Sequence, residues 1–165
     1  MSYKFQYIDS TTFTRSDAGV YNASVVVREG DPVQESYTVS SVSPVRYLLN
    51  NNNSDTTSLK VTVQQSVSNT AVQVYNLADD ITTVGSNSAV YFLQENHDGA
   101  YEVQFGDNII GRKPSDGNII KLNYNVVNGP TVNGTKTFNG PATLAGNSSY
   151  TILTTLSARG GSNPQ

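Results

Sequence analysis

The sequence predicts an all-β protein, an antiparallel β-sandwich or barrel-like module of short strands with long hairpin loops and little helix. Apolar and polar residues alternate over residues 59–64, 71–75, 101–105 and 120–126. This period of two is typical of strands that pack one face on a core and expose the other to water. Clusters of Gly, Asn, Asp and Pro separate nearly all of the apolar segments, and these residues favour chain reversals. Since no stretch keeps a 3.6-residue period over three turns, we expect eight to ten short strands.

Four denser apolar runs predict strands that are buried on both faces. They are residues 24–28, 45–49, 90–93 and 150–153. The pairs Asp98-Gly99 and Asp116-Gly117 lie between alternating segments, so each is expected to form a tight hairpin turn. The best candidate for a helical turn is residues 76–81.

Composition and length predict the domain organisation. The chain has 165 residues, of which 36% are hydrophobic and 14% are charged. Both fractions lie below the roughly 45–50% and about 25% of average globular proteins. One domain is expected at this length, and we assign it to residues 1–157. Within it, the Gly/Pro/Thr/Asn-rich residues 128–145 are expected to form a projecting loop or hairpin, and residues 158–165 a flexible, linker-like C-terminus.

The composition also argues against several classes of function. The absence of Cys excludes a disulfide framework, a thiolate nucleophile and a Cys-based zinc site, and the single histidine excludes metal sites that need two imidazoles. A net charge of −3 gives no support for binding to a phosphate backbone. No apolar run approaches the roughly 20 residues that span a bilayer. We therefore expect no cofactor, no metal, no nucleic-acid partner and no membrane insertion.

Two segments superficially suggest catalytic chemistry. Residues 106–113 resemble the phosphate-binding pattern G-x-x-x-x-G-K-[ST], but Arg112 displaces the lysine by one residue and Pro114 stands where a hydroxyl is needed. Their flanks are strand-like, whereas a phosphate loop opens a helix, so a glycine-hinged hairpin is favoured. Residues 95–99 gather two carboxylates around His97, but they match no calcium-loop spacing and include no placed nucleophile. The prediction is a solvated hairpin tip, no catalytic residue and no enzyme.

An ordered series of short motifs resembles a known family. The first motif is a turn that leads into the strand at residues 59–63. The second extends from residue 91 to the end of the strand at 101–105 and the loop that follows it. The third is a turn that precedes residues 119–120. The residues that carry the pattern most clearly are Asp55, Thr56, Thr57, Phe105, Gly106, Asp107, Gly111, Asp116 and Gly117. In order and spacing, most of residues 20–135 resembles the baseplate wedge protein of T4-like contractile-tailed phages, within the baseplate J-like group. Family members are several times longer, so an internal domain or a short relative is expected.

The resemblance implies a structural component of a phage tail baseplate wedge. Such proteins pair with other wedge subunits and with further copies of themselves in a ring around the tail hub, and the ring rearranges on contraction. The implied location is the virion, in the tail baseplate, after assembly in the host cytoplasm. Arg112 and Lys113 are candidate interface residues. On its own, the chain is expected to be monomeric or weakly dimeric.

Two other functions remain open from the residues alone. The ten tyrosines and many Asn residues suit a carbohydrate-binding or adhesin module of a phage tail fibre, since exposed tyrosine stacks on sugars and fills interfaces. A polysaccharide-degrading enzyme is the third hypothesis, although no pair of carboxylates stands out among the many Asp and Glu residues.

Overall fold

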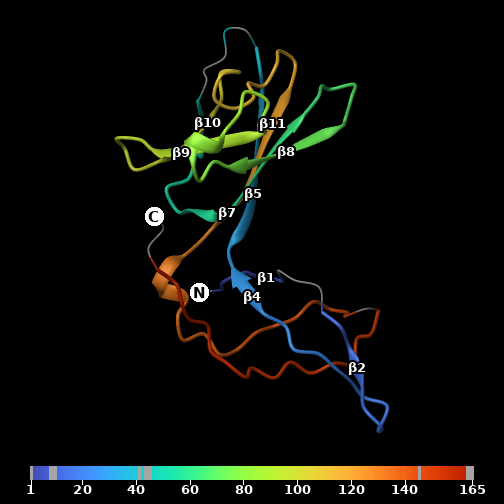
Figure 1. The fold of residues 1–165 in the computed structure, drawn as a ribbon. Helices are drawn as coiled ribbons and strands as arrows, with labels where there is room; N and C mark the ends of the chain where they lie inside the picture. Colours follow the sequence, from blue (N-terminus) through green and yellow to red (C-terminus); the bar gives the residue numbers. More distant parts are fainter. Residues whose placement is uncertain (1, 8–10, 41, 43–45, 145, 163–165) are drawn as a thin grey trace. The chain divides into compact units, whose positions relative to one another are not determined.

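The structure, a computed structural model, describes residues 2–7, 11–40, 42, 46–144 and 146–162. It is nearly all β, which confirms the predicted fold class. The chain holds two compact units (Figure 1). The first joins Met1–Gly30 to Asn128–Asn163, and the second contains Asp31–Val127 with the last two residues. The expectation of one folding domain over residues 1–157 stays a prediction, because compactness does not show whether the units fold independently.

The second unit is a nearly closed, mixed sheet of seven strands in the order β5-β11-β7-β8-β9-β10-β6. Every neighbouring pair is antiparallel except β8 and β9, which run parallel. Figure 1 shows β5, β7 and β11 running beside one another. The strand bounds are β5 Asp31–Thr38, β6 Arg46–Leu48, β7 Ser54–Gln64, β8 Val72–Leu77, β9 Val90–Glu95, β10 Tyr101–Phe105 and β11 Ile119–Val126.

The core of this sheet follows from the alternation in the sequence. In β11, buried residues alternate with partly buried ones, and Ile120 and Leu122 are fully enclosed. Val61 of β7 and Val103 of β10 are equally buried on the same inner side. Period-two patterning therefore places one side chain in two inside, which confirms the strands predicted at 59–64, 101–105 and 120–126. A strand also forms at 72–77, but there Val72 and Val74 are exposed and Tyr75 is buried, so the predicted packing of its apolar face is wrong.

The first unit has little regular structure. Strands β1 Phe5–Tyr7 and β4 Val27–Glu29 form one two-stranded sheet, and β2 Thr14–Arg15 and β3 Tyr21–Asn22 form another. The 3₁₀ helix η2, Gly129–Val132, begins the second stretch of this unit. Its two stretches are joined by Glu29, whose carboxylate accepts hydrogen bonds from the backbone and side-chain nitrogens of Asn128, at 3.1 and 2.6 Å.

Residues 158–161 are hydrogen-bonded within this first unit. The backbone N–H of Gly134 donates to Ala158 O, and the N–H of Ala158 donates to Thr135 O. The side chain of Asn133 exchanges two bonds with the backbone of Gly161, both at 2.9 Å. Residues 158–161, the start of the expected linker, are therefore held by hydrogen bonds. Residues 163–165 lie outside the described residues, so the flexibility of the C-terminus stays a prediction.

Two of the predicted buried strands are wrong. Residues 24–28 are exposed, and only their last two positions lie in a strand, β4. Residues 150–153 form no strand, and all but the first of them are exposed. An apolar run becomes a buried strand only where other strands cover it, and the described residues of the first unit form no sheet that does so. The other two runs do contribute β6 and β9, although Arg46 is exposed and residue 45 lies outside the described residues.

Two local expectations also need correction. The Asp98-Gly99 turn does join neighbouring strands, β9 and β10, but Asp116-Gly117 is not a hairpin turn. It separates β10 from β11, which are not neighbours in the sheet, because β11 inserts between β5 and β7. The helical turn lies at Ile81–Thr83 (η1) rather than at 76–81, since β8 continues to Leu77 and Asp80 caps the turn through the backbone N–H of Thr82.

Candidate interaction surfaces

The first group of motif residues forms a wide bulge in β7. Between Asp55 and Lys60, four residues oppose the single residue Tyr124 of β11. Asp55 Oδ1 accepts hydrogen bonds from the backbone N–H and the hydroxyl of Thr57, at 3.0 and 2.6 Å. Thr56 lies within the same bulge. A bulge bends a strand and increases its twist, so this motif shapes the curvature of the sheet.

The second group forms a compact loop after β10. A Cβ atom on Gly106 would lie 2.2 Å from the carbonyl oxygen of Gly111, so only glycine permits this approach. Asp107 Oδ1 accepts from the backbone N–H groups of Ile109 and Ile110, both at 2.9 Å. These bonds hold the pKa of the Asp107 carboxyl below its usual value. The loop is rigid for a local reason, and it is not the hairpin that the glycine spacing suggested, since the neighbours of β10 are β9 and β6.

Three further motif residues, Phe105, Asp116 and Gly117, stabilise the sheet itself. The ring of Phe105 packs in the core against Tyr47 and Tyr75, with ring centroids 5.6 and 5.2 Å away. The turn containing Asp116 and Gly117 is tied to the end of β5, because the N–H of Gly117 donates to Val39 O at 2.9 Å. The motif residues therefore form a β-bulge, a compact loop, a turn and one aromatic contact in the core. A role for them in binding stays a prediction.

Arg112 and Lys113 lie on the surface of the second unit, directly after the compact loop. Both side chains are exposed, whereas both backbone nitrogens are fixed. Arg112 N donates to Ser88 O at 2.8 Å, and Lys113 N donates to Asn108 Oδ1 at 2.9 Å. Two positively charged side chains thus extend from backbone that is held by hydrogen bonds, and Ile109 of the preceding loop is exposed as well. Their role at an interface stays a prediction.

A hydrogen-bond network that the sequence analysis missed links the two ends of the sheet. Glu35 of β5 accepts from the backbone N–H and side-chain amide of Asn50, both at 3.1 Å, and from the hydroxyl of Tyr124 at 2.6 Å. The hydroxyl of Tyr37 lies 2.8 Å from both Glu35 Oε2 and the carbonyl oxygen of Leu48. Strands β5 and β6 are the first and last of the sheet, so these side chains close the gap where backbone pairing stops.

The network perturbs its two tyrosines. Burial, together with the hydrogen bond to Glu35, raises the pKa of Tyr37 to about 12. The same causes raise the pKa of Tyr124 further above its usual value. Both hydroxyls therefore remain protonated donors at neutral pH. The alternation in residues 120–126 did predict Tyr124 as an inward-facing residue, but no pattern in the sequence pairs it with Glu35.

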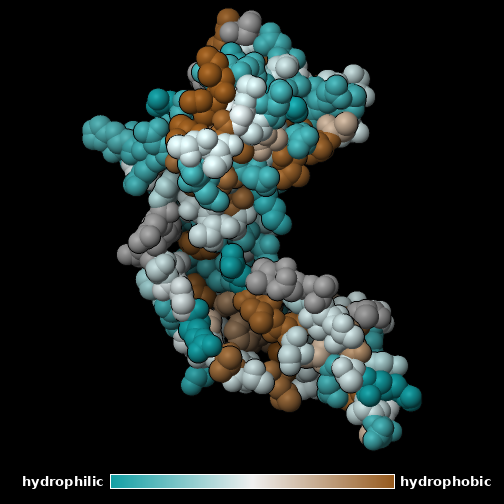
Figure 2. Space-filling view, viewed as in Figure 1, coloured by the Kyte–Doolittle hydropathy of each residue, from teal (hydrophilic) through white to brown (hydrophobic). Residues whose placement is uncertain are grey.

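The first unit exposes many large apolar side chains, and brown residues are visible at the surface of both units in Figure 2. Among its described residues, Val132 is the single buried hydrophobic side chain. Val26 is 69% exposed and Leu153 is 81% exposed. The exposed large hydrophobic residues of this unit are Tyr7, Phe13, Val20, Tyr21, Val25, Val26, Val27, Leu144, Ile152, Leu153 and Leu156.

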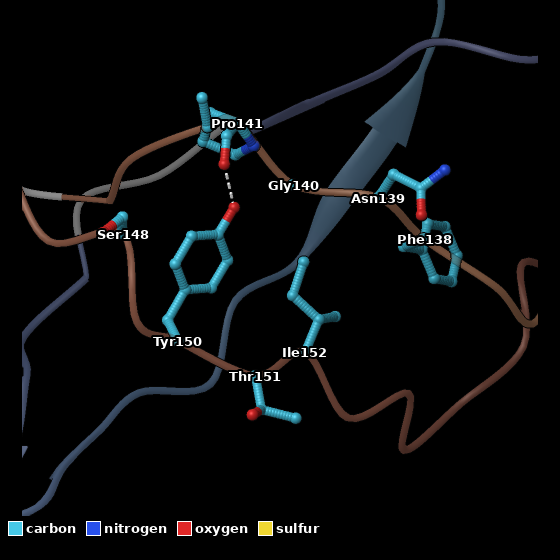
Figure 3. A pocket seen from close by; sticks show the side chains of 9 residues that line it. Phe138, Asn139, Gly140, Pro141, Ser148, Tyr150, Thr151 and Ile152 are labelled. Atoms are coloured by element: carbon cyan, nitrogen blue, oxygen red, sulfur yellow. Dashed lines mark hydrogen bonds between the residues drawn. The ribbon is translucent and has the colours of Figure 1, made fainter.

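A shallow hollow lies on the first unit between residues 138–142 and 148–152 (Figure 3). Tyr150 crosses it, and its hydroxyl donates to the carbonyl oxygen of Pro141. Gly140 lies beneath this ring, because a Cβ atom there would meet the Tyr150 hydroxyl at 2.5 Å. Phe138 and Ile152 line the hollow together with the polar residues Asn139, Ser148 and Thr151, so its surface combines apolar and polar side chains.

The described residues contain no group of three or more His, Asp or Glu side chains placed to hold a metal ion. In the same part of the chain, no helix has the length and apolar character needed to cross a membrane. The chain has no significant match among protein-family models, nor among the curated proteins compared with it.

Proposed function

We propose that this chain is a structural, non-enzymatic module of a phage tail baseplate wedge, located in the virion, where it contacts other wedge subunits and further copies of itself. The observation that carries the proposal is the first unit, which exposes eleven large apolar side chains and buries one among its described residues. The motif series in residues 20–135 supports the choice of a baseplate among possible assemblies.

The first unit buries too little apolar surface to be stable alone. Ordering the backbone costs roughly 1–2 kcal/mol per residue, and burial of a Val, Leu or Phe side chain returns about 1.5–3 kcal/mol. A unit with a single buried apolar side chain gains little to offset that cost. An excess of exposed large apolar side chains over buried ones favours association with other proteins. Neighbouring subunits would supply the missing burial.

The second unit supports the proposal in a different way. Its core is enclosed, its sheet is nearly closed, and the loop at residues 106–111 is locked by backbone approaches and hydrogen bonds. A module that changes neighbours when a tail contracts must keep its own shape while its contacts exchange. A rigid sheet that carries exposed charged side chains such as Arg112 and Lys113 suits that task.

Detection of the chain in purified virions tests the proposal, by electron cryomicroscopy or by mass spectrometry of isolated tails. The expected result is density for the seven-stranded sheet in the baseplate. Replacing Leu153 and Leu156 together by Ser should lower incorporation into tails, whereas Val67→Ser, equally exposed on the second unit, should not. A chain absent from tails, or incorporation unaffected by the double replacement, would overturn the proposal.

The hollow of Figure 3 favours a second candidate function, a carbohydrate-binding or adhesin module of a tail fibre. Aromatic side chains such as Phe138 and Tyr150 stack against sugar rings. A glycan array, followed by titration with host surface polysaccharide, tests it: saturable binding that Phe138→Ala abolishes would favour this function over the wedge. Release of reducing ends from the same polysaccharide would instead point to a degrading enzyme.

A further inference from the structure

Strand β8 pairs with different neighbours along its length. Its ladder with β7 runs from Val72 to Tyr75, but its ladder with β9 holds only Asn76 and Leu77. The N–H of Asn76 donates to Ala89 O on the β9 side. Because backbone groups alternate in direction along a strand, the N–H groups of Val72 and Val74 face the same side. No strand among the described residues pairs with them there, so this half of β8 is an edge.

The surroundings of this edge are apolar and acidic. Val72 and Val74 are each about half exposed, and Leu77 and Ile81 beyond them are exposed as well. Asp79 and Asp80 stand between these apolar residues, and both are exposed. Hydrogen bonds from the hydroxyl and backbone N–H of Thr82 hold the pKa of Asp80 below its usual value, so its carboxylate is negative at neutral pH.

The first unit carries a segment with the complementary character. Val25, Val26 and Val27 are consecutive, β-branched and exposed, and Arg28 follows them. β-branched residues favour extended backbone, and Val27 already begins β4, whose only strand neighbour among the described residues is β1. Residues 24–28 can therefore add to a strand edge with little change in conformation.

The two units also differ in charge. The first contains five Lys or Arg and three Asp or Glu residues, and the second contains five and ten. Their formal net charges are therefore +2 and −5. Opposite charge steers the first unit of one molecule toward the second unit of another, and it disfavours contact between two second units.

We propose that residues 24–28 of one copy pair with the free edge of β8, Val72–Tyr75, of a second copy. The partner is this same chain, and the recognition is strand addition: backbone hydrogen bonds give affinity, while packing of the valines gives register. The contact uses different surfaces on the two copies, so it is head-to-tail, and it generates a ring or a filament rather than a closed dimer. This inference rests on the proposed function, because it names the partner of the exposed first unit.

The contact is expected to be weak in isolation. Four paired residues extend over about 13 Å of strand, and stable interfaces bury about 1,200–2,000 Å² in total. Such a contact populates at high protein concentration or when other subunits hold the copies together. The expectation of a monomer or weak dimer for the isolated chain is consistent with this size.

Site-specific crosslinking tests the pairing, because the full chain contains no cysteine. Val26→Cys and Val74→Cys chains are mixed and treated with a short bismaleimide, and the products are identified by mass spectrometry. We expect a crosslinked dimer that contains one chain of each kind. His97→Cys, in the exposed turn between β9 and β10, replaces Val74→Cys as the control and should give a yield several-fold lower. Raising NaCl from about 0.05 to about 0.5 M should reduce the specific yield.

Three results would overturn the pairing. They are a yield no higher than that of the His97→Cys control, a Val26→Cys chain that crosslinks to itself as efficiently, and a Val26→Cys/Val74→Cys double variant that crosslinks within one chain. The outcome is separate from that of the proposed function. A chain that is found in tails but fails to crosslink refutes the pairing alone, and one that crosslinks but is absent from tails refutes the baseplate role alone.

Discussion

Replacing Glu35 by Ala should destabilise the second unit more than any other single surface-accessible change to its edge strands. The replacement removes the acceptor for the Tyr124 hydroxyl and for two nitrogens of Asn50. Tyr37 loses one of two acceptors, but its hydroxyl can still donate to the carbonyl oxygen of Leu48. The main loss is therefore at Tyr124, which is only 3% exposed.

The magnitude follows from these contacts. A hydrogen bond to a charged group contributes about 1.5–3 kcal/mol, and a buried donor left without a partner costs a similar amount. The bond from Tyr124 belongs in the upper part of that range because it is buried and 2.6 Å long. The two bonds from Asn50 are exposed, so they add little. We expect a loss of about 3 kcal/mol, or about 6–12 °C in Tm for a chain of this length.

Urea unfolding followed by circular dichroism measures this loss. Glu95→Ala is the matched control, because Glu95 is also a strand glutamate but is exposed at the end of β9. The control should change the free energy of unfolding by less than about 0.5 kcal/mol. Tyr124→Phe should reproduce most of the effect of Glu35→Ala, and the double variant should show non-additivity, since both remove the same bond. A Glu35→Ala chain as stable as the control would refute the closing role of the network.

Three other predictions concern the same unit. Gly106→Ala should lower the free energy of unfolding more than Gly117→Ala, because a Cβ on Gly106 would clash with the carbonyl of Gly111. At Gly117 a Cβ meets no neighbour, and the cost is only that of a positive φ for a residue with a side chain, about 1–2 kcal/mol. Equal urea midpoints for the two variants would contradict this. The free energy of unfolding should fall as pH rises from about 10 to about 12, since Tyr37 loses its proton at lower pH in the unfolded chain than in the folded one. Tyr37→Phe should make that fall less steep. An unchanged slope in this variant would show that Tyr37 does not titrate as described. Leu122→Ala should cost about 2–5 kcal/mol by thermal unfolding, and a cost below about 1 kcal/mol would show that the core at this position is not enclosed.

The sequence predicted most strands of the second unit because burial there follows a local rule, but it did not predict β5, whose first residues, Asp31 and Pro32, favour a turn. Alternation in residues 120–126 required only that one face of β11 meet a core, and neighbouring strands do cover that face. The same reasoning failed for residues 24–28 and 150–153, where apolar runs were equally dense. An apolar run shows that its side chains would be stabilised by burial, but only the surrounding structure shows whether other segments of the chain bury them.

The features of the candidate surfaces also include some that the sequence predicted and some that it did not. The spacing of Gly106 and Gly111 pointed to a tight loop, and backbone approaches do demand glycine at the first of these positions. The position of Arg112 on an exposed corner depended on which strands adjoin the loop. The Glu35 network could not be predicted, since its members are as many as 89 residues apart and meet only because the sheet curves round.

By itself, the sequence determined an all-β chain, most of the alternating strands of its sheet and the glycine-dependent turns, because these depend on neighbours within a few residues. Only the tertiary structure decided the strand order, the near closure of the sheet through Glu35, and the division into two units of opposite charge. It also decided that the valines of residues 25–27 lie on the surface. These features depend on contacts between segments that are distant in the sequence. The entropic cost of closing a loop rises only slowly with its length, so one pattern of residues is compatible with many different strand pairings.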